Sequence, residues 1–152
     1  MDKVLFICVH NSGRSQMAEA FLKKHADEGE FEVESAGFEP TQINPLVVDV
    51  MQEVGTNLSD KKTQSVFDLF KAGKIYSFVM TVCGEGDDQC PVFPGMVHRL
   101  HLPFPNPAKV QGTKEEKLDK IRAIRDEIEK NILHFIEWRR SGMTTPLTLV
   151  GN

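Results

Sequence analysis

A short apolar run that leads straight into a polar loop and then into a helical pattern constrains this chain most strongly. The run is Val4–Ile7, the segment Cys8–Ser15 follows it, and the helical pattern begins at Arg14. A buried strand, a tight loop and a helix in this order form the first half of a β-α-β unit. The sequence therefore predicts an α/β fold with this loop at the carboxyl end of the first strand.

The loop combines a cysteine with an arginine six residues later. In Cys8-Val9-His10-Asn11-Ser12-Gly13-Arg14-Ser15, backbone N–H groups of the turn and the helix N-terminus supply positive potential. The arginine can hold two oxygens of a tetrahedral anion, and the serine can hydrogen-bond the sulfur or a leaving group. The same field favours the thiolate of the cysteine, which is then a nucleophile. The predicted catalytic residues are Cys8, Arg14 and Ser15, and the predicted oxyanion-binding residues are His10, Asn11, Ser12, Gly13 and Arg14.

A simpler interpretation treats Cys8 as a small apolar residue at the end of a buried strand. Arg14 and Ser15 would then be ordinary surface residues at the start of a helix. That interpretation leaves the Asn-Ser-Gly sequence between them unexplained.

Strand and helix patterns alternate along the rest of the chain. We predict strands over Lys3–Val9, Phe31–Gly37, Ile75–Val82 and Val97–Leu102, and helices over Arg14–Ala26, Pro45–Glu53, Ser65–Lys71 and from Thr113 onward. In the last helix, Thr113 and Glu116 have the spacing of a capping box, and apolar residues then recur at intervals of three and four. This order predicts a parallel sheet with helices on both faces.

A second pair of cysteines frames a loop rich in glycine and aspartate. Cys83 follows a predicted parallel strand, as Cys8 does, and the carboxyl ends of such strands open on the same side of the sheet. The loop from Cys83 to Cys90 is a poor helix former, and a mobile loop suits a cysteine that must approach, react and withdraw. We therefore predict that Cys83 and Cys90 are also catalytic.

Two other interpretations of these cysteines remain open. The pair could bind zinc together with His98 or His101, although structural zinc sites usually space their cysteines by two to four residues. Alternatively, Cys83 only packs at a strand end and Cys90 has no role.

Composition excludes several classes of function. The chain has 152 residues and a formal net charge of −4, so it has the length of one domain and lacks the basic character of a nucleic-acid-binding protein. No apolar run approaches the length of a membrane span, and the first residues enter a strand without a signal peptide. Three cysteines, an odd number, suit chemistry in a reducing cytoplasm. We expect a single catalytic domain over residues 1–140 and a C-terminal tail over residues 141–152.

The segment from Cys8 to Glu19 resembles the low-molecular-weight protein tyrosine phosphatases and the arsenate reductases that share their fold. The shared signature is Cys-x5-Arg-Ser in the first strand-loop-helix unit, and the resemblance extends from Val4 to about Trp138. It implies a three-layer sandwich, in which a four-stranded parallel sheet is flanked by helices. It also implies that arsenate or phosphate is the bound oxyanion.

Cys83 and the pair Cys90-Pro91 match positions of the thioredoxin-linked arsenate reductases in particular. The resemblance implies that Cys8 attacks arsenic, that Cys83 releases arsenite by forming a disulfide with Cys8, and that Cys90 moves the disulfide to the loop. The reductant would be an external thiol of the thioredoxin type. We expect no tightly bound cofactor and no partnership with nucleic acid or membrane.

The chain departs from the phosphatases at their general acid, an aspartate that precedes a proline. Here Asn106 precedes Pro107, and an amide cannot supply a transferable proton. The aromatic pair of many tyrosine phosphatases is also replaced, by Ala108 and Lys109. A phosphatase acting on phosphotyrosine or small phosphoesters through a Cys8 phosphocysteine is the first alternative to the reductase. A non-catalytic oxyanion or redox sensor is the second.

Members of the reductase group can carry a cation site beside the anion loop. Asn11, Glu19 and Ser35 match three of its positions, and Ser65 falls where an aspartate is usual, with an insertion near Lys61 and Lys62. A structural role explains these residues better: Asn11 braces the loop, and Ser35 bonds it from the next strand. We therefore predict no bound metal.

Overall fold

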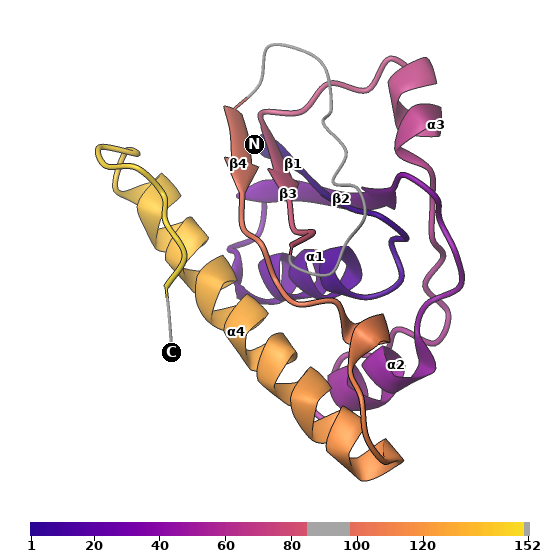
Figure 1. Ribbon diagram of the computed structural model, residues 1–152. Coiled ribbons are helices and arrows are strands. Elements are labelled where there is room, and N and C mark those ends of the chain that lie inside the picture. The colour runs from indigo at the N-terminus through magenta and orange to yellow at the C-terminus, as the bar shows by residue number, and fades with distance from the viewer. Residues whose placement is uncertain (85–97, 151–152) are drawn as a thin grey trace.

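The computed structural model describes residues 1–84 and 98–150 as a parallel β-sheet with helices on both faces (Figure 1). The strands are β1 (Asp2–Cys8), β2 (Phe31–Gly37), β3 (Phe78–Thr81) and β4 (His98–His101), and their order in the sheet is β2-β1-β3-β4. All neighbouring strands are parallel. The predicted four-stranded parallel sheet is confirmed.

The register of the sheet brings the ends of β1 and β3 to one edge. Cys8 is paired with Gly37 of β2, and Ile7 is paired with Thr81 of β3. Beyond β3, the Val82 N–H donates to the Ile7 carbonyl at 2.9 Å. Cys8 and Cys83 therefore follow neighbouring strands at the carboxyl edge of the sheet, where α/β folds place their ligands.

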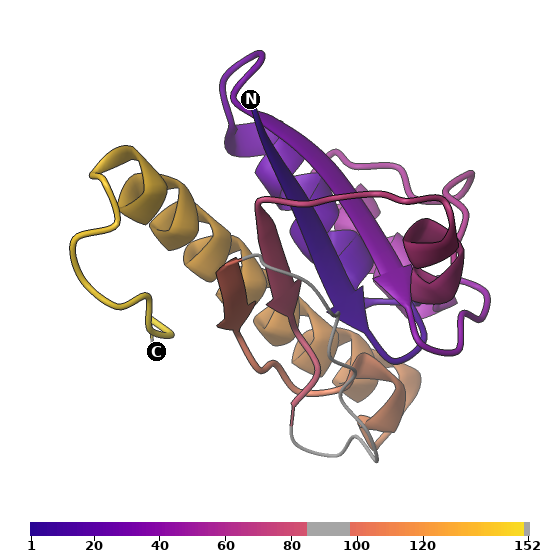
Figure 2. The ribbon, with the colours of Figure 1, turned by 90° about the horizontal axis from the view of Figure 1, so that it is seen from above.

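Helices cover the two faces of the sheet unequally (Figure 2). They are α1 (Arg14–His25), α2 (Pro45–Gln52), α3 (Val66–Lys71), the short 3₁₀ helix η1 (Pro107–Lys109) and α4 (Lys114–Arg140). One apolar core joins β1 and β3 to α1, α2 and α4, and a smaller core on the opposite face joins β1, β2 and β3 to α3. This gives the three-layer sandwich that the sequence predicts.

The long helix α4 begins and packs as its sequence predicts. The Thr113 hydroxyl accepts from the Glu116 N–H at 3.2 Å, and the Glu116 carboxylate accepts from the Thr113 N–H at 3.3 Å. The apolar stripe is buried along its whole length: Leu118, Ile121, Ile124, Ile128, Ile132 and Phe135. Within the described residues no helix is both long and apolar enough to cross a bilayer, because α4 has 27 residues but carries charges along its length.

Two details of the predicted elements are wrong. The strand predicted over Ile75–Val82 is shorter, because pairing is limited to β3 and Ile75 is 77% exposed. On α3, which begins one residue later than the predicted helix, Val66 and Leu69 are buried and Phe70 is 55% exposed. Val97, where the last strand was predicted to begin, lies outside the described residues.

After α4 the chain turns back and runs along the helix as far as Val150. The turn is made by Gly142 and Met143, both with positive φ. The indole N–H of Trp138 donates to the Thr145 carbonyl at 2.6 Å. The buried side chain of Asn131 forms hydrogen bonds with both the N–H and the carbonyl of Val150, at 2.7 and 3.3 Å. Residues 141–150 are therefore seated on the domain.

An ion-pair cluster joins the end of α2 to α4 and predicts how stability responds to acid. The Arg122 guanidinium, with a second contribution from Arg125, lowers the pKa of Glu53 to about 2 from its usual 4.5. A depressed pKa in the folded state stabilises the fold above the unfolded-state value and loses that contribution as pH falls through the folded value. The contribution of Glu53 should therefore be complete above about pH 4.5 and vanish near pH 2.

Urea denaturation between pH 2 and 7 measures this effect. The free energy of unfolding of Glu53→Gln should be lower than that of the wild type at pH 7, and the two should converge near pH 2. Glu28→Gln, at an exposed carboxylate for which the described residues provide no ion pair, is the matched control. Parallel curves for Glu53→Gln and the wild type would contradict the assignment.

Candidate active site

The thiol of Cys8 lies at the end of β1 and is held by two hydrogen bonds. The Asn11 N–H donates to its sulfur at 3.1 Å, and the Ser15 hydroxyl lies 2.9 Å from the same atom. Cys8 is a free thiol and only 2% exposed. Hydrogen bonds donated to a sulfur stabilise its negative charge, so this contact set suits a nucleophilic thiolate.

Asn11 braces the loop from inside. Its φ of 53° lies in the left-handed region, where asparagine is among the few tolerated residues besides glycine. Its side-chain amide donates to the hydroxyls of Ser15 at 2.8 Å and Ser35 at 3.0 Å. Its carbonyl oxygen accepts from the Gln16 side chain and the Gln64 N–H, both at 3.0 Å. Every polar atom of this buried side chain therefore holds the loop.

Arg14, the first residue of α1, is almost completely buried beside Cys8. One of its terminal nitrogens donates to the Phe104 carbonyl at 3.0 Å, which orients the guanidinium. The N-cap of α1 is Gly13, which makes no side-chain capping bond, and the first turn carries no acidic residue. The positive end of the helix is therefore available to an anion at the loop.

A small polar cavity lies over the thiol. Its lining residues are Cys8, His10, Ser12, Gly13, Arg14, Asn44, Asn106, Pro107 and Ala108. Its volume is about 10 Å³, which is room for one water-sized group. The cavity contains five of the residues predicted from the sequence, and any large substituent on a bound anion would lie outside it.

The segment that follows β2 supports the loop from outside, and the sequence did not indicate this. The N–H groups of Glu39, Thr41 and Asn44 donate to the carbonyls of Val9, His10 and Ser12, at 2.7, 3.0 and 2.9 Å. His10, predicted to line the loop, also hydrogen-bonds the Glu39 carbonyl through Nδ1 at 3.0 Å.

Gly37 permits this close approach between the loop and β2. A Cβ atom at Gly37 would lie 2.7 Å from the Asn11 nitrogen and 2.9 Å from the Val9 carbonyl oxygen. The glycine at the end of the predicted second strand was the only signal for this contact in the sequence.

Cys83 is fully buried and disulfide-bonded, in contrast to the free thiol of Cys8. Cys90 lies outside the described residues, so its pairing and role stay predictions. A disulfide sulfur is not the thiolate that zinc binds. The histidines of the zinc alternative are engaged elsewhere: His98 stacks on Phe78, and His101 Nδ1 lies 2.7 Å from the Thr81 hydroxyl.

Asn106, at the position of the phosphatase acid, lines the cavity near Cys8. Its side-chain oxygen accepts from the Ala108 N–H at 2.9 Å and caps η1. An amide therefore lines the oxyanion cavity at the residue that the resemblance aligns with the phosphatase acid.

The cation site implied by the resemblance does not fit the residues present. Asn11, Ser35 and Glu19 do lie together, since the Ser35 hydroxyl donates to the Glu19 carboxylate at 2.5 Å. However, the ammonium of Lys61 lies 3.1 Å from one carboxylate oxygen of Glu19, and that of Lys23 lies 2.6 Å from the other. The hydroxyl of Ser65, the fourth position, caps α3 instead.

Within residues 1–84 and 98–150, no three His, Cys, Asp or Glu side chains converge as metal ligands. The oxygens that a cation would need at Glu19 and Asn11 already accept hydrogen bonds or contact an ammonium group. We therefore assign no metal to this site.

Comparison with known proteins identifies relatives that share the fold of this chain. Residues 3–140 match the family described as low molecular weight phosphotyrosine protein phosphatase. An arsenate reductase of Shouchella clausii (strain KSM-K16) is 44% identical over 135 residues, 88% of this chain and 94% of that protein. The crystal structure of arsenate reductase from Archaeoglobus fulgidus has a TM-score of 0.63 at 30% identity and matches 85% of this chain and 98% of that chain.

A further solved structure is the thioredoxin-dependent arsenate reductase of Corynebacterium glutamicum. Its TM-score is 0.56 at 36% identity, and the match covers 89% of this chain and 63% of that chain. Since the family match spans nearly the whole chain and the Shouchella relative aligns over most of both sequences, the resemblance carried by the Cys8 loop is confirmed. The chain belongs to the low molecular weight phosphotyrosine protein phosphatase family, and its relatives from Shouchella, Archaeoglobus and Corynebacterium are arsenate reductases.

Proposed function

We propose that this protein is an arsenate reductase that uses Cys8, Cys83 and Cys90 in a disulfide relay. The observation that carries the proposal is that two cysteines at the same edge of the sheet differ in redox state. Cys8 is a hydrogen-bonded thiol in an oxyanion cavity, while Cys83, after the neighbouring strand, is in a disulfide. This combination is expected at the end of a relay that has restored its nucleophile.

The chemistry begins with the Cys8 thiolate. It attacks arsenic and displaces one oxygen as water, giving a sulfur–arsenic bond. The loop N–H groups and the Arg14 guanidinium offset the charge on the remaining oxygens, and Ser15 stabilises the thiolate. These side chains line the cavity or contact the sulfur.

The second step transfers two electrons to arsenic. The Cys83 thiolate attacks the Cys8 sulfur, and the electron pair of the breaking sulfur–arsenic bond goes to arsenic, which leaves as arsenite. The Cys90 thiolate then attacks Cys83 and releases Cys8 as a thiolate. An external dithiol of the thioredoxin type reduces the resulting Cys83–Cys90 disulfide and is itself oxidised.

Coupled turnover tests this proposal. Purified protein is mixed with arsenate, thioredoxin, thioredoxin reductase and NADPH, and NADPH oxidation and arsenite formation are followed. We expect arsenate-dependent oxidation with one arsenite per NADPH. Replacing thioredoxin by glutathione and glutaredoxin should support little turnover. Absence of arsenite with both reductants, together with efficient hydrolysis of phosphotyrosine, would overturn the reductase assignment in favour of the phosphatase.

Asn106 provides the sharpest test between reductase and phosphatase. The wild type should hydrolyse aryl phosphates poorly, and best when the leaving group needs little protonation. Asn106→Asp should raise hydrolysis of substrates with poor leaving groups, by at most the general-acid factor of about 10²–10⁴. An aspartate oxygen can still accept from the Ala108 N–H, so the cap of η1 is kept.

The matched control for Asn106→Asp is Asn106→Ser, which keeps a capping oxygen but provides no acid. Rates are compared for p-nitrophenyl phosphate and an alkyl phosphate. Equal effects of the two variants on both substrates would show that Asn106 does not occupy the position of the acid.

We also propose that the catalytic unit corresponds to residues 1–140 and that the protein works in the cytoplasm. The family match ends at residue 140. A reducing compartment suits a chain that must keep three thiols available for exchange.

A further inference from the structure

Glu19 carries the most buried carboxylate among the described residues, and it is linked to the Cys8 loop through Ser35. Its side chain is only 4% exposed, on the inner side of α1. The charge is compensated by two ammonium groups, Lys23 one turn further along α1 and Lys61 from the segment after α2. A buried carboxylate needs such compensation, because removing its partner leaves an uncompensated charge in a region of low dielectric constant.

A continuous set of hydrogen bonds joins this carboxylate to the nucleophile. We call it the Glu19 network, and its members are Glu19, Ser35, Asn11 and Ser15. The Ser35 hydroxyl donates to Glu19 and accepts from the Asn11 amide, and that amide also donates to the Ser15 hydroxyl beside the Cys8 sulfur. Every link is buried, so the position of one member constrains the next.

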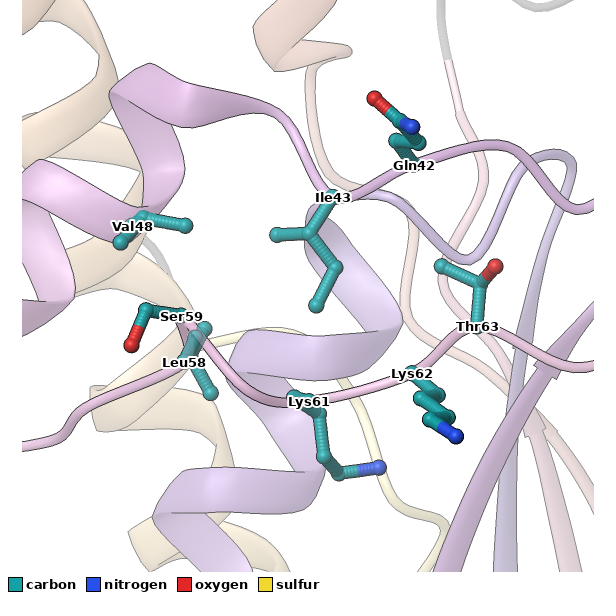
Figure 3. A pocket seen from close by; sticks show the side chains of 8 residues that line it. All are labelled: Gln42, Ile43, Val48, Leu58, Ser59, Lys61, Lys62 and Thr63. Atoms are coloured by element: carbon teal, nitrogen blue, oxygen red, sulfur yellow. The ribbon is translucent and has the colours of Figure 1, made fainter.

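Pockets lie on both sides of the segment that carries Lys61, which is anchored in the core by the buried side chain of Leu58. A cavity of about 490 Å³ separates it from the segment that contains Ile43, and Figure 3 shows the Lys61 side chain pointing away from Ile43. A second cavity, of about 360 Å³, lies on the side of α1 and is lined by Gln16, Glu19 and Lys61. Between these pockets, polar contacts such as the Lys61–Glu19 ion pair add to the packing of Leu58 in fixing the segment.

We propose that the Lys61 ammonium replaces the metal cation that the resemblance implies at this place. Lys61 is then a positioning residue, because its charge on Glu19 holds the Glu19 network and thereby the loop around Cys8. A covalently attached cation cannot dissociate, so the reactivity of Cys8 becomes independent of the monovalent cation in solution. The inference rests on the proposed function only in taking Cys8 as the reacting group.

The cavity that Lys61 shares with α1 contains further oxygen atoms. The side-chain oxygen of Gln16 is buried and accepts no hydrogen bond within the described residues. It belongs to a side chain that lines the same cavity as Glu19 and Lys61. With Lys61 removed, the carboxylate oxygen of Glu19 that it contacts is left for a cation from solution, and hard cations such as K⁺ prefer oxygen ligands.

The test measures the alkylation of Cys8 and does not depend on arsenate. Fully reduced protein is treated with iodoacetamide at pH 7, and modification of the Cys8 peptide is followed by mass spectrometry in choline chloride or KCl of equal ionic strength. In the wild type the rate should be the same in both salts. In Lys61→Met it should fall roughly tenfold in choline, within the usual range of couplings in one polar network, and recover in KCl.

Three further variants separate positioning from a general effect on folding. Lys61→Arg keeps the charge and should stay independent of the cation. Lys62→Met removes the neighbouring ammonium, which has no ion pair within the described residues, and should behave as the wild type. Adding Glu19→Gln to Lys61→Met removes the buried charge that Lys23 alone would then offset, and should restore most of the rate without K⁺.

Two results would overturn the proposal. If Lys61→Met reacts as fast as the wild type in choline, the ammonium is only a surface contact of Glu19. If the wild type itself requires K⁺, a solution cation acts at the site in addition to the lysine. A failed arsenate assay with the expected alkylation pattern would reject the proposed function and leave this inference standing.

Discussion

Replacing Cys8 by serine should reduce arsenate turnover to less than about one thousandth of the wild-type rate. A serine hydroxyl is a far weaker nucleophile than a thiolate at pH 7, and loss of a nucleophile is among the largest single effects on catalysis. Serine has nearly the size of cysteine, and the Asn11 N–H that donates to the sulfur can donate to its oxygen. The fold and the oxyanion cavity should therefore be preserved.

Arsenite formation with excess thioredoxin measures the effect, and phosphate binding by calorimetry shows that the cavity is intact. Ser15→Ala is the matched control, because it removes one hydrogen bond to the sulfur but keeps the thiol. It should lower the rate partially. Substantial arsenate reduction by Cys8→Ser would show that another group is the nucleophile.

Replacing Cys90 by serine should stop the reaction after a single arsenite per protein. Cys83 follows β3 beside the end of β1, so it can still attack the Cys8 sulfur and release arsenite. The disulfide would then remain between Cys8 and Cys83, because no third thiol can move it. Steady turnover with thioredoxin should be almost completely lost, since Cys8 is nearly inaccessible to an external dithiol.

Peptide mapping under non-reducing conditions identifies the bridge. After one turnover without reductant, the wild type should contain Cys83 joined to Cys90, and Cys90→Ser should contain Cys8 joined to Cys83. The control is Cys83→Ser, which should form no such bridge and release no arsenite. A stable bridge between Cys8 and Cys90 in the wild type would contradict the order of the relay.

Local patterns in the sequence predict most of the fold. The alternation of apolar strands and helical segments is sufficient for the parallel sheet, and the capping box at Thr113 marks the start of α4. The boundaries of β3 were wrong because an apolar sequence such as that around Ile75 does not show which residues find a pairing partner. On α3, Val66 and Leu69 are buried and Phe70 is exposed, and a helix of six residues is too short for periodicity to define its buried face.

The candidate site likewise contains residues that the sequence predicts and residues that only the structure reveals. The Cys8 loop is one continuous segment, so its residues are predicted from their order and chemistry. The supports of that loop come from distant segments: Glu19 from α1, Ser35 from β2, Lys61 and Gln64 from the segment before α3. No local spacing connects a lysine at position 61 with a carboxylate at position 19. Only the folded chain shows that the Lys61 ammonium lies 3.1 Å from the buried Glu19 carboxylate.

The contacts between the C-terminal segment and α4 determine what the fluorescence of this protein can report. Trp138 is the only tryptophan of the chain, and it packs against Phe78 and Phe135 while its indole N–H is bound to Thr145. Phe78 begins β3, at the opposite edge of the sheet from Cys8. Intrinsic fluorescence will therefore report the docking of residues 141–150, and a change of the disulfide state will need a probe placed elsewhere.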